Sequence, residues 1–172
     1  GSLAFYATIQ KIYNQKAKTL GIEIDFRKHN QKNCEKIYKQ LDINVIEGSS
    51  ISKKTIDKIK KYLNGRKKIM VILDSDHSST HVLEELNIYS KIVSKGSYLI
   101  CTDTIVDFMP KGFFLTDWQK KRASHRNFDK GTGPYTAIKK FLKNNKNYKI
   151  DTKFHAKSTI TENPFGFLKK IK

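Results

Sequence analysis

Short β-branched and aromatic segments alternate with helical segments along this chain, and that alternation constrains its fold most. Extended segments are expected at 22–26, 43–48, 68–74 and 96–106, and helices at 2–18, 30–41, 50–65, 78–93 and 133–145. This spacing is typical of an α/β protein with a mainly parallel sheet, because parallel strands need a crossover helix between them. Two further extended segments, at 148–154 and 158–171, predict an antiparallel pair at the C-terminal end.

The length of the chain, 172 residues, fits one domain over 1–172. No apolar run approaches the roughly 20 residues needed to cross a bilayer, and the first residues do not form a signal peptide. Two cysteines, Cys34 and Cys101, make no disulfide framework. We therefore expect a cytoplasmic protein without a membrane span.

The formal net charge of +18 raises the question of a nucleic-acid partner. Lysine accounts for most of it and is spread along the predicted helices. The sequence has no aromatic pattern of an RNA-recognition motif, no zinc-ligand spacing and no concentrated basic helix. A nucleic-acid partner is therefore not expected, although a basic nucleic-acid-binding protein or an RNA methyltransferase stays an alternative. An anionic substrate or a peripheral anionic surface also fits the charge.

Polar residues, with one glycine, lie at or directly after the end of each of the first four predicted strands. They are Glu23 and Asp25, then Gly48, Ser49 and Ser50, then Asp74, Asp76 and His77, and finally Thr102, Asp103 and Thr104. Ligands of open α/β sheets bind beyond the carboxyl ends of the strands. A single acid at such a place is more often a helix cap, but four consecutive strand ends favour a ligand site.

These strand ends offer distinct chemistry. An acid after the first strand can accept hydrogen bonds from ribose hydroxyls. Asp74 and Asp103 are expected on neighbouring strands, where their carboxylates can share a hard cation such as Mg²⁺. His77 follows Asp74 by three residues, and histidine is the natural proton acceptor near pH 7.

A known family matches these residues. The stretch LDSDHSSTHVLEELNIYSKIVSKGSYLICTDTIVD, with the landmarks GSLAFYA, GIEIDFRKHN, VIEGSSIS, GTGPYTAIKKFL and TENPFGFLKKI, resembles the cephalosporin hydroxylase / rhamnosyl O-methyltransferase family. Members of that family are similar to class I S-adenosylmethionine-dependent O-methyltransferases, many of them with a Mg²⁺ site. The resemblance implies a Rossmann-like α/β fold with helices on both faces of the sheet and a C-terminal antiparallel hairpin.

The resemblance also implies roles for individual residues. The cofactor-binding residues that it implies are Gly1, Ser2, Glu23, Asp25, Gly48, Ser49, Ser50 and Asp74. Glu23 matches the acid that holds the ribose, and Gly48 begins the loop on the adenine side. The implied metal ligands are Asp74, Asp103 and Thr102, and the implied catalytic residues are His77 as general base and Asp74.

The chain departs from the family pattern in two ways. Thr102 stands where the family has the first of two adjacent acids, and a hydroxyl binds Mg²⁺ more weakly than a carboxylate. Asp76 or water is expected to compensate. The chain also begins inside the cofactor motif, so the first strand is expected to be missing and the domain to be incomplete at its N-terminus. The resulting open sheet edges leave a homo-oligomer open.

The expected activity is S-adenosylmethionine-dependent, Mg²⁺-assisted O-methylation of a hydroxyl on a saccharide or secondary-metabolite acceptor. Residues 107–132, with Trp118, are expected to cover the acceptor. The alternative within the same fold is a non-catalytic methyltransferase remnant.

Overall fold

The computed structural model describes residues 1–110, 131–157 and 160–172. It contains two compact units, Gly1–Asn64 and Gly65–Lys172. The expected covering stretch with Trp118 falls largely outside the described residues. Among the residues described, no helix is both long and apolar enough to cross a membrane.

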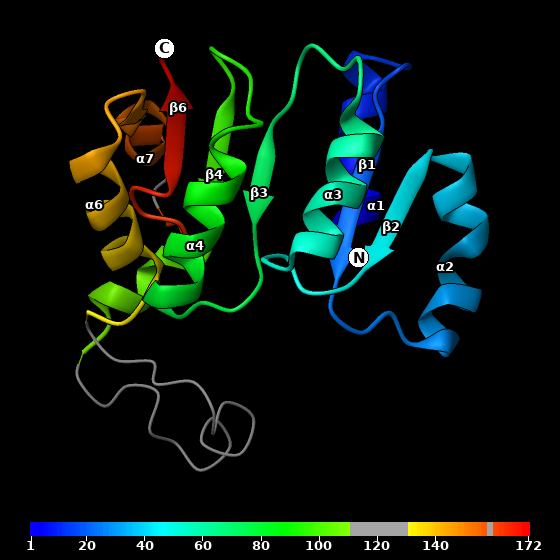
Figure 1. The fold of residues 1–172 in the computed structure, drawn as a ribbon, viewed down its shortest axis with the longest axis horizontal. Coiled ribbons are helices and arrows are strands. Elements are labelled where there is room, and N and C mark those ends of the chain that lie inside the picture. Colours follow the sequence, from blue (N-terminus) through cyan, green and yellow to red (C-terminus); the bar gives the residue numbers. More distant parts are fainter. Residues whose placement is uncertain (111–130, 158–159) are drawn as a thin grey trace. The chain divides into compact units, whose positions relative to one another are not determined.

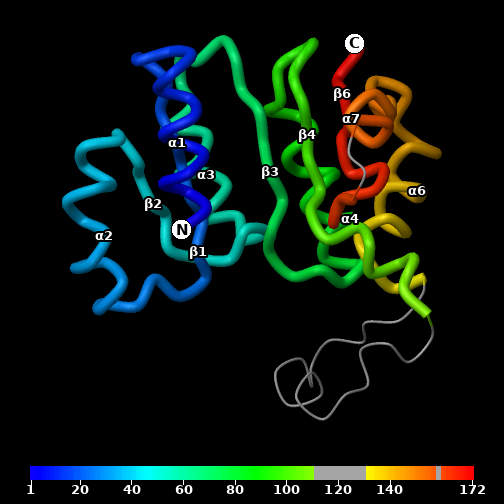
Figure 2. The backbone as a smooth tube through the Cα atoms, turned by 180° about the vertical axis from the view of Figure 1, so that it is seen from behind, coloured from blue at the N-terminus to red at the C-terminus, as the bar shows by residue number. Residues whose placement is uncertain are grey.

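The first unit has a pair of parallel strands between helices. Its elements are α1 (Ser2–Tyr13), β1 (Thr19–Glu23), α2 (Lys28–Gln40), β2 (Ile43–Glu47) and α3 (Lys53–Leu63). β1 and β2 run parallel, with Thr19 opposite Ile43 and Glu23 opposite Glu47. Helix α1 lies on one face of this pair and α3 on the other, as the two opposite views show (Figures 1 and 2). The expected arrangement of helices on both faces is therefore present in this unit.

The second unit has a four-stranded sheet. Its elements are β3 (Val71–Leu73), α4 (Ser79–Tyr89), β4 (Tyr98–Cys101), the 3₁₀ helix η1 (Thr104–Phe108), α6 (Pro134–Asn144), β5 (Tyr148–Ile150), α7 (Thr152–Lys157) and β6 (Phe167–Lys170). The strand order is β3-β4-β6-β5, with β3 parallel to β4 and β6 antiparallel to both of its neighbours. Three of the four strands thus point the same way, which confirms a mainly parallel sheet with a C-terminal antiparallel pair.

The core of the second unit lies between its sheet and the packed helices α4 and α6. Helix α4 is on the side of the sheet that faces the viewer in Figure 1 and on the far side in Figure 2. The core side chains buried here include Leu86, Leu99, Ala137, Ile138, Phe141 and Leu168. Burial of each large apolar side chain stabilises the fold by roughly 1.5–3 kcal/mol, so this layer holds the ends of β3 and β4 in place.

From the sequence, Ser50 or Ser52 is expected near the N-cap of the helix at 50–65, and Pro134 near the first turn of the helix at 133–145; the structure has Ser52 and Pro134 in these places. The side chain of Ser52 accepts a hydrogen bond from the Thr55 backbone N–H and caps α3. Pro134 is in the first turn of α6, where its missing N–H costs nothing.

The C-terminal segments differ from the expected pair of long strands. Residues 152–157 form a helix, because the Asp151 side chain accepts a hydrogen bond from the Lys153 backbone N–H and caps the first turn. β4 likewise ends at Cys101, and Thr104 begins the 3₁₀ helix. The strands are therefore shorter than the apolar patterns suggested.

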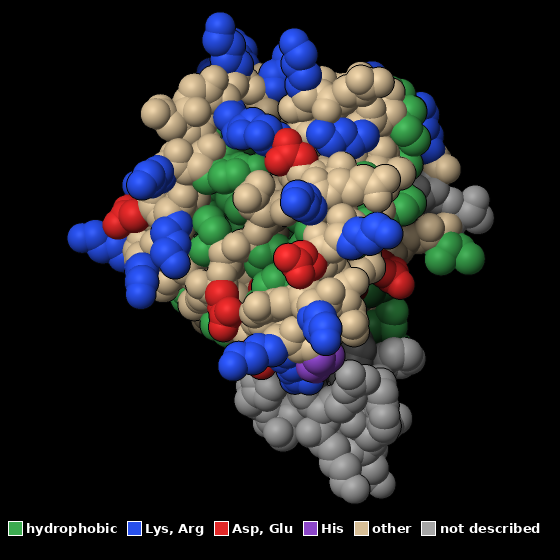
Figure 3. Space-filling view, turned by 90° about the vertical axis from the view of Figure 1, so that its right-hand side faces the viewer, with side chains coloured by type: hydrophobic (Ala, Val, Ile, Leu, Met, Phe, Trp, Pro, Cys, Tyr) green, Lys and Arg blue, Asp and Glu red, His purple; other side chains and the backbone are tan. Residues whose placement is uncertain are grey.

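The basic side chains do not gather into one patch on the face drawn in Figure 3. Lys and Arg side chains there lie apart, with acidic and uncharged ones between them. This distribution on that face fits lysines on solvated helix surfaces rather than a concentrated phosphate-binding surface.

Candidate functional site

The carboxyl ends of β3 and β4 lie side by side in the second unit. Their parallel register ends with Leu73 opposite Cys101, so the next residues, Asp74 and Thr102, are neighbours. The Thr102 backbone N–H bonds the Leu73 carbonyl at 3.1 Å and extends the ladder by one step. The Thr102 hydroxyl is 2.9 Å from Oδ1 of Asp74 and 3.0 Å from the Leu73 carbonyl oxygen. Thr102 therefore supports the Asp74 carboxylate from the neighbouring strand end.

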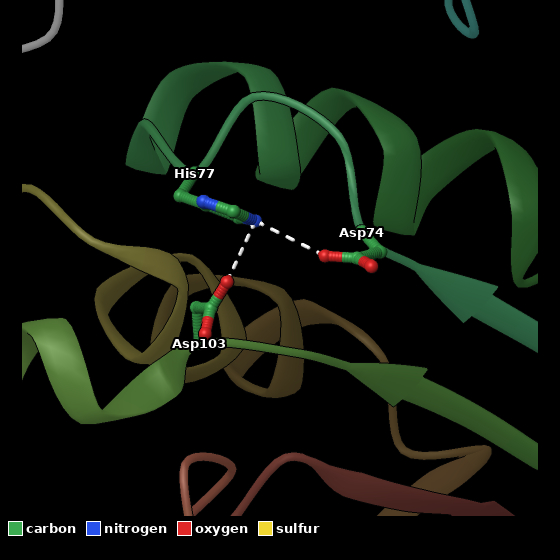
Figure 4. Close-up of side chains that lie close together, drawn as sticks. All are labelled: Asp74, His77 and Asp103. Atoms are coloured by element: carbon green, nitrogen blue, oxygen red, sulfur yellow. Dashed lines mark ion pairs between the residues drawn. The ribbon is translucent and has the colours of Figure 1, made fainter. Parts of the chain in front are cut away.

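The His77 imidazole stands between two carboxylates (Figure 4). Its Nε2 atom is 3.5 Å from Oδ1 of Asp74 and 3.1 Å from Oδ2 of Asp103. The His77 side chain is only 17% exposed, against 54% for Asp74 and 34% for Asp103. The imidazole is thus largely shielded, while both acids remain open to a ligand or to water.

The turn that carries His77 leads directly into α4. Oδ1 of Asp76 accepts a hydrogen bond from the Ser78 backbone N–H at 2.9 Å. The Ser79 backbone N–H bonds the Thr132 carbonyl at 2.6 Å. Asp76 therefore stabilises the start of α4. Among the described residues, the group that could hold a metal ion consists of Asp74, His77 and Asp103, without Asp76.

Asp103 has an uncommon backbone conformation. Its φ of 52° and ψ of 27° lie in the left-handed region, which aspartate tolerates better than most residues. The Asn163 side chain accepts a hydrogen bond from the Asp103 backbone N–H at 2.7 Å, and the Thr104 hydroxyl bonds the Pro164 carbonyl at 2.7 Å. These contacts with the segment before β6 hold a conformation that costs about 1–3 kcal/mol, as strained residues at functional sites do.

The electrostatics of the cluster favour an ionised Asp74. The hydrogen bond from His77 lowers the pKa of the Asp74 carboxyl; burial opposes this, and the Thr102 hydroxyl lowers the pKa further. Asp74, His77 and Asp103 each offer one ligand atom, and these atoms lie within 4.8 Å of one another. Two carboxylates with open faces suit a hard divalent cation, which completes its shell with water. A cation that touched both carboxylates would have Nε2 of His77 as a neighbour or as a third ligand.

The cofactor residues predicted from the sequence lie in the first unit, except Asp74. Glu23 ends β1, and its carbonyl accepts a hydrogen bond from the Gly48 backbone N–H at 2.9 Å. Gly48 has a φ of +146°, and a Cβ there would lie 2.5 Å from Oγ1 of Thr55, so the position requires glycine. The structure thus brings Glu23 next to the loop formed by Gly48, Ser49 and Ser50.

The remaining predicted cofactor residues are more exposed. Oδ2 of Asp25 lies 3.4 Å from Nε of Arg27 in an exposed pair. Gly1 occupies the N-cap position of α1, and Ser2 is the first residue of that helix.

The supporting role of Asn163 was not predicted from the sequence. Asn163 lies 60 residues after Asp103, within the segment 158–171 that was predicted to be extended. The Asn-Pro pair at 163–164 is a turn signal that could have moved the strand boundary. Nothing local in the sequence indicates its hydrogen bond to Asp103.

The fold is that of a Rossmann-like methyltransferase, with polar side chains at the carboxyl ends of its parallel strands. The chain belongs to the Rhamnosyl O-methyltransferase/CmcI family, whose model matches residues 1–171. No solved structure matches the chain significantly.

Curated relatives come from mycobacteria. The rhamnosyl O-methyltransferases of Mycobacterium tuberculosis (strain ATCC 25618 / H37Rv) and Mycobacterium bovis (strain BCG / Pasteur 1173P2) are each 29% identical over 172 residues, 98% of this chain. The rhamnosyl O-methyltransferase of Mycobacterium leprae (strain TN) is 31% identical over 111 residues, 64% of this chain and 46% of that protein. The chain spans 62% of the length of the first two relatives.

Proposed function

We propose that this chain is the catalytic part of an S-adenosylmethionine-dependent O-methyltransferase that acts on a saccharide hydroxyl with the assistance of Mg²⁺. The observation that carries the proposal is the position of His77 Nε2, 3.5 Å from Asp74 and 3.1 Å from Asp103, in a member of this family. Deprotonation of an acceptor hydroxyl needs a base, which His77 can supply. The two exposed carboxylates beside it could hold the cation that lowers the pKa of the hydroxyl.

Two groups of residues have different roles in this proposal. Glu23, with Asp25 close by, holds the ribose of the cofactor, and the loop formed by Gly48, Ser49 and Ser50 borders the adenine. Gly1 and Ser2 belong to the same cofactor site. The family match over 1–171 supports one methyltransferase domain that includes both units.

The second group is the cluster at the ends of β3 and β4. Asp74 and Asp103 would hold the cation, with Thr102 beside Asp74, and the acceptor hydroxyl would be oriented beside these carboxylates. When bound, Mg²⁺ lowers the pKa of a coordinated hydroxyl, and S-adenosylmethionine supplies an electrophilic methyl group. His77 accepts the hydroxyl proton at Nε2, a contribution of roughly 10²–10⁴ in rate. To accept the hydroxyl proton, Nε2 of His77 must present a lone pair rather than a hydrogen.

The acceptor class rests on the relatives. Their name, rhamnosyl O-methyltransferase, specifies a rhamnosyl acceptor, which supports a saccharide here. A secondary metabolite and a lipid-linked sugar are the other acceptors that the assay must include.

The test is transfer of a labelled methyl group from S-adenosylmethionine to a panel of rhamnosides, other glycosides, glycolipids, secondary metabolites and RNA. We expect label on a saccharide hydroxyl, with RNA unlabelled. Calorimetry with S-adenosylmethionine is the parallel measurement. Absence of both binding and transfer contradicts the proposal and supports a non-catalytic remnant of the fold.

A further inference from the structure

Helix α4 carries a buried carboxylate, Glu85, that the proposed reaction does not use. This residue is 1% exposed, as much buried as the apolar residues of the core. Glutamate is almost never fully buried without partners, because burial of a charge is costly. The burial of Glu85 therefore calls for a structural or functional explanation.

The contacts of Glu85 point toward the candidate site. The Ser75 hydroxyl donates a hydrogen bond to Oε1 of Glu85 at 2.8 Å. Nε2 of His81, one helical turn earlier on α4, is 3.5 Å from the same oxygen. Oε2 has no hydrogen-bond partner among the described residues. Since Ser75 directly follows Asp74, this bond ties the turn from Asp74 to His77 to the body of α4.

Glu85 also lies close to the end of β4. Burial raises the pKa of the Cys101 thiol, and the Glu85 carboxylate raises it further. Cys101 is the last residue of β4, two positions before Asp103. Glu85 is thus hydrogen-bonded to the residue that follows Asp74 and acts electrostatically on the last residue of β4.

The Ser75 hydroxyl donates its hydrogen to a carboxylate that is held in the core. The arrangement provides a fixed point in the middle of the turn between Asp74 and His77.

We propose that Glu85 is a positioning residue, which holds Ser75 and thereby sets the turn that brings Asp74 and His77 to Asp103. Only the expected effect of Glu85 on methyl transfer rests on the proposed function. The ordering of the turn is a property of the protein alone and can be measured without any ligand.

The first test is hydrogen exchange of the ligand-free protein at the Ser78 and Ser79 amides, which are hydrogen-bonded within and beside the turn. Ser75→Ala removes the donor with little change in volume, and we expect these amides to exchange about 5–10-fold faster. The matched control is Tyr148→Phe, which removes a buried 2.9 Å hydrogen bond to the Ser90 carbonyl at the other end of α4. Unchanged exchange in Ser75→Ala, or equal acceleration in the control, overturns the proposal.

The second test is steady-state methyl transfer. We expect Ser75→Ala to lower kcat about 5–10-fold while the KM for S-adenosylmethionine stays the same. Glu85→Gln keeps an oxygen that accepts from Ser75 and should retain most of kcat, whereas Glu85→Ala should not. An unchanged kcat in Ser75→Ala refutes the link to catalysis. If the wild type transfers no methyl group, the proposed function fails, and the exchange result still decides whether Glu85 positions the turn.

Discussion

The Thr102 hydroxyl lies 2.9 Å from Oδ1 of Asp74 and donates a hydrogen bond across the adjacent ends of β4 and β3. The family pattern places a carboxylate at this position, and the threonine leaves the cluster one negative charge short. The hydrogen bond shows what threonine supplies instead: it orients the remaining carboxylate and lowers the pKa of Asp74 after the larger effect of His77. Thr102 thus acts on the site through Asp74, whether or not its oxygen also contacts a cation.

Thr102→Val should weaken cation binding. Valine has nearly the same shape but leaves Asp74 without its hydroxyl donor, so the affinity for Mn²⁺, used as a spectroscopic substitute for Mg²⁺, should fall about 3–10-fold. Electron paramagnetic resonance titration of free Mn²⁺ measures this. Thr102→Ser, which keeps the hydroxyl, is the control and should bind as the wild type does. Equal affinities in all three proteins would remove Thr102 from the site.

Asp107→Ala should destabilise the second unit. The buried Asp107 carboxylate accepts hydrogen bonds from the backbone N–H groups of Gly131, Gly133 and Thr136 and from the Thr136 hydroxyl, at 2.8–3.2 Å. It joins η1 to the first turn of α6, so its loss leaves several buried donors unsatisfied. We expect a decrease of about 2–4 kcal/mol in the free energy of unfolding.

Urea unfolding measures this effect, and Asp107→Asn, which retains one acceptor oxygen, should lose less. Asp57→Asn, on the exposed face of α3, is the control for the loss of one negative charge. An Asp107→Ala protein as stable as this control would show that the four hydrogen bonds contribute nothing net.

Tyr148→Phe should make stability less sensitive to alkaline pH. Burial raises the pKa of the Tyr148 phenol from 10.0 to about 12. The unfolded chain releases this proton near pH 10, before the folded protein does, so the contribution of Tyr148 to stability is present below pH 10 and declines between pH 10 and 12.

The variant should be about 1 kcal/mol less stable at pH 7, because it lacks the bond to the Ser90 carbonyl. Its stability should nevertheless fall less than that of the wild type between pH 10 and 12. Urea unfolding at pH 7, 10 and 12 gives the free energy of unfolding of both proteins as a function of pH. The difference between the two profiles excludes the contributions of Tyr89 and Cys101, because both proteins contain them. Parallel pH profiles would contradict the assignment.

The periodic features of the sequence predicted much of the fold. Alternating strands and helices, the cap at Ser52 and the proline at the start of α6 are local signals, and they appear as expected. The proximity of Asp74, His77 and Asp103 also followed, because adjacent parallel strands end at one edge of a sheet. Their chemical roles stay predictions.

Features that depend on partners distant in sequence were not predicted. Asp107 meets Gly131 and Asp103 meets Asn163 across 24 and 60 residues, and no local pattern encodes either contact. Glu85 fits the polar positions of an ordinary amphipathic helix, yet it faces the core. At 152–157 the alternation suggested a strand, but the Asp151 cap made a helix. Tertiary contacts and side-chain caps, rather than local sequence patterns, determined the structure at these positions.

The assignment of Asp74, His77 and Asp103 to methyl transfer is tested most directly by one measurement. It is the initial rate of methyl transfer from S-adenosylmethionine to a saccharide hydroxyl, compared across single variants of the cluster. We predict that Asp74→Asn, His77→Ala and Asp103→Asn each lower this rate by about 100-fold or more in the presence of Mg²⁺, because each removes a charge or the base. His29→Ala, at an exposed histidine of α2, should react as the wild type does. Wild-type rates in all three folded cluster variants would contradict the assignment of Asp74, His77 and Asp103 to the reaction.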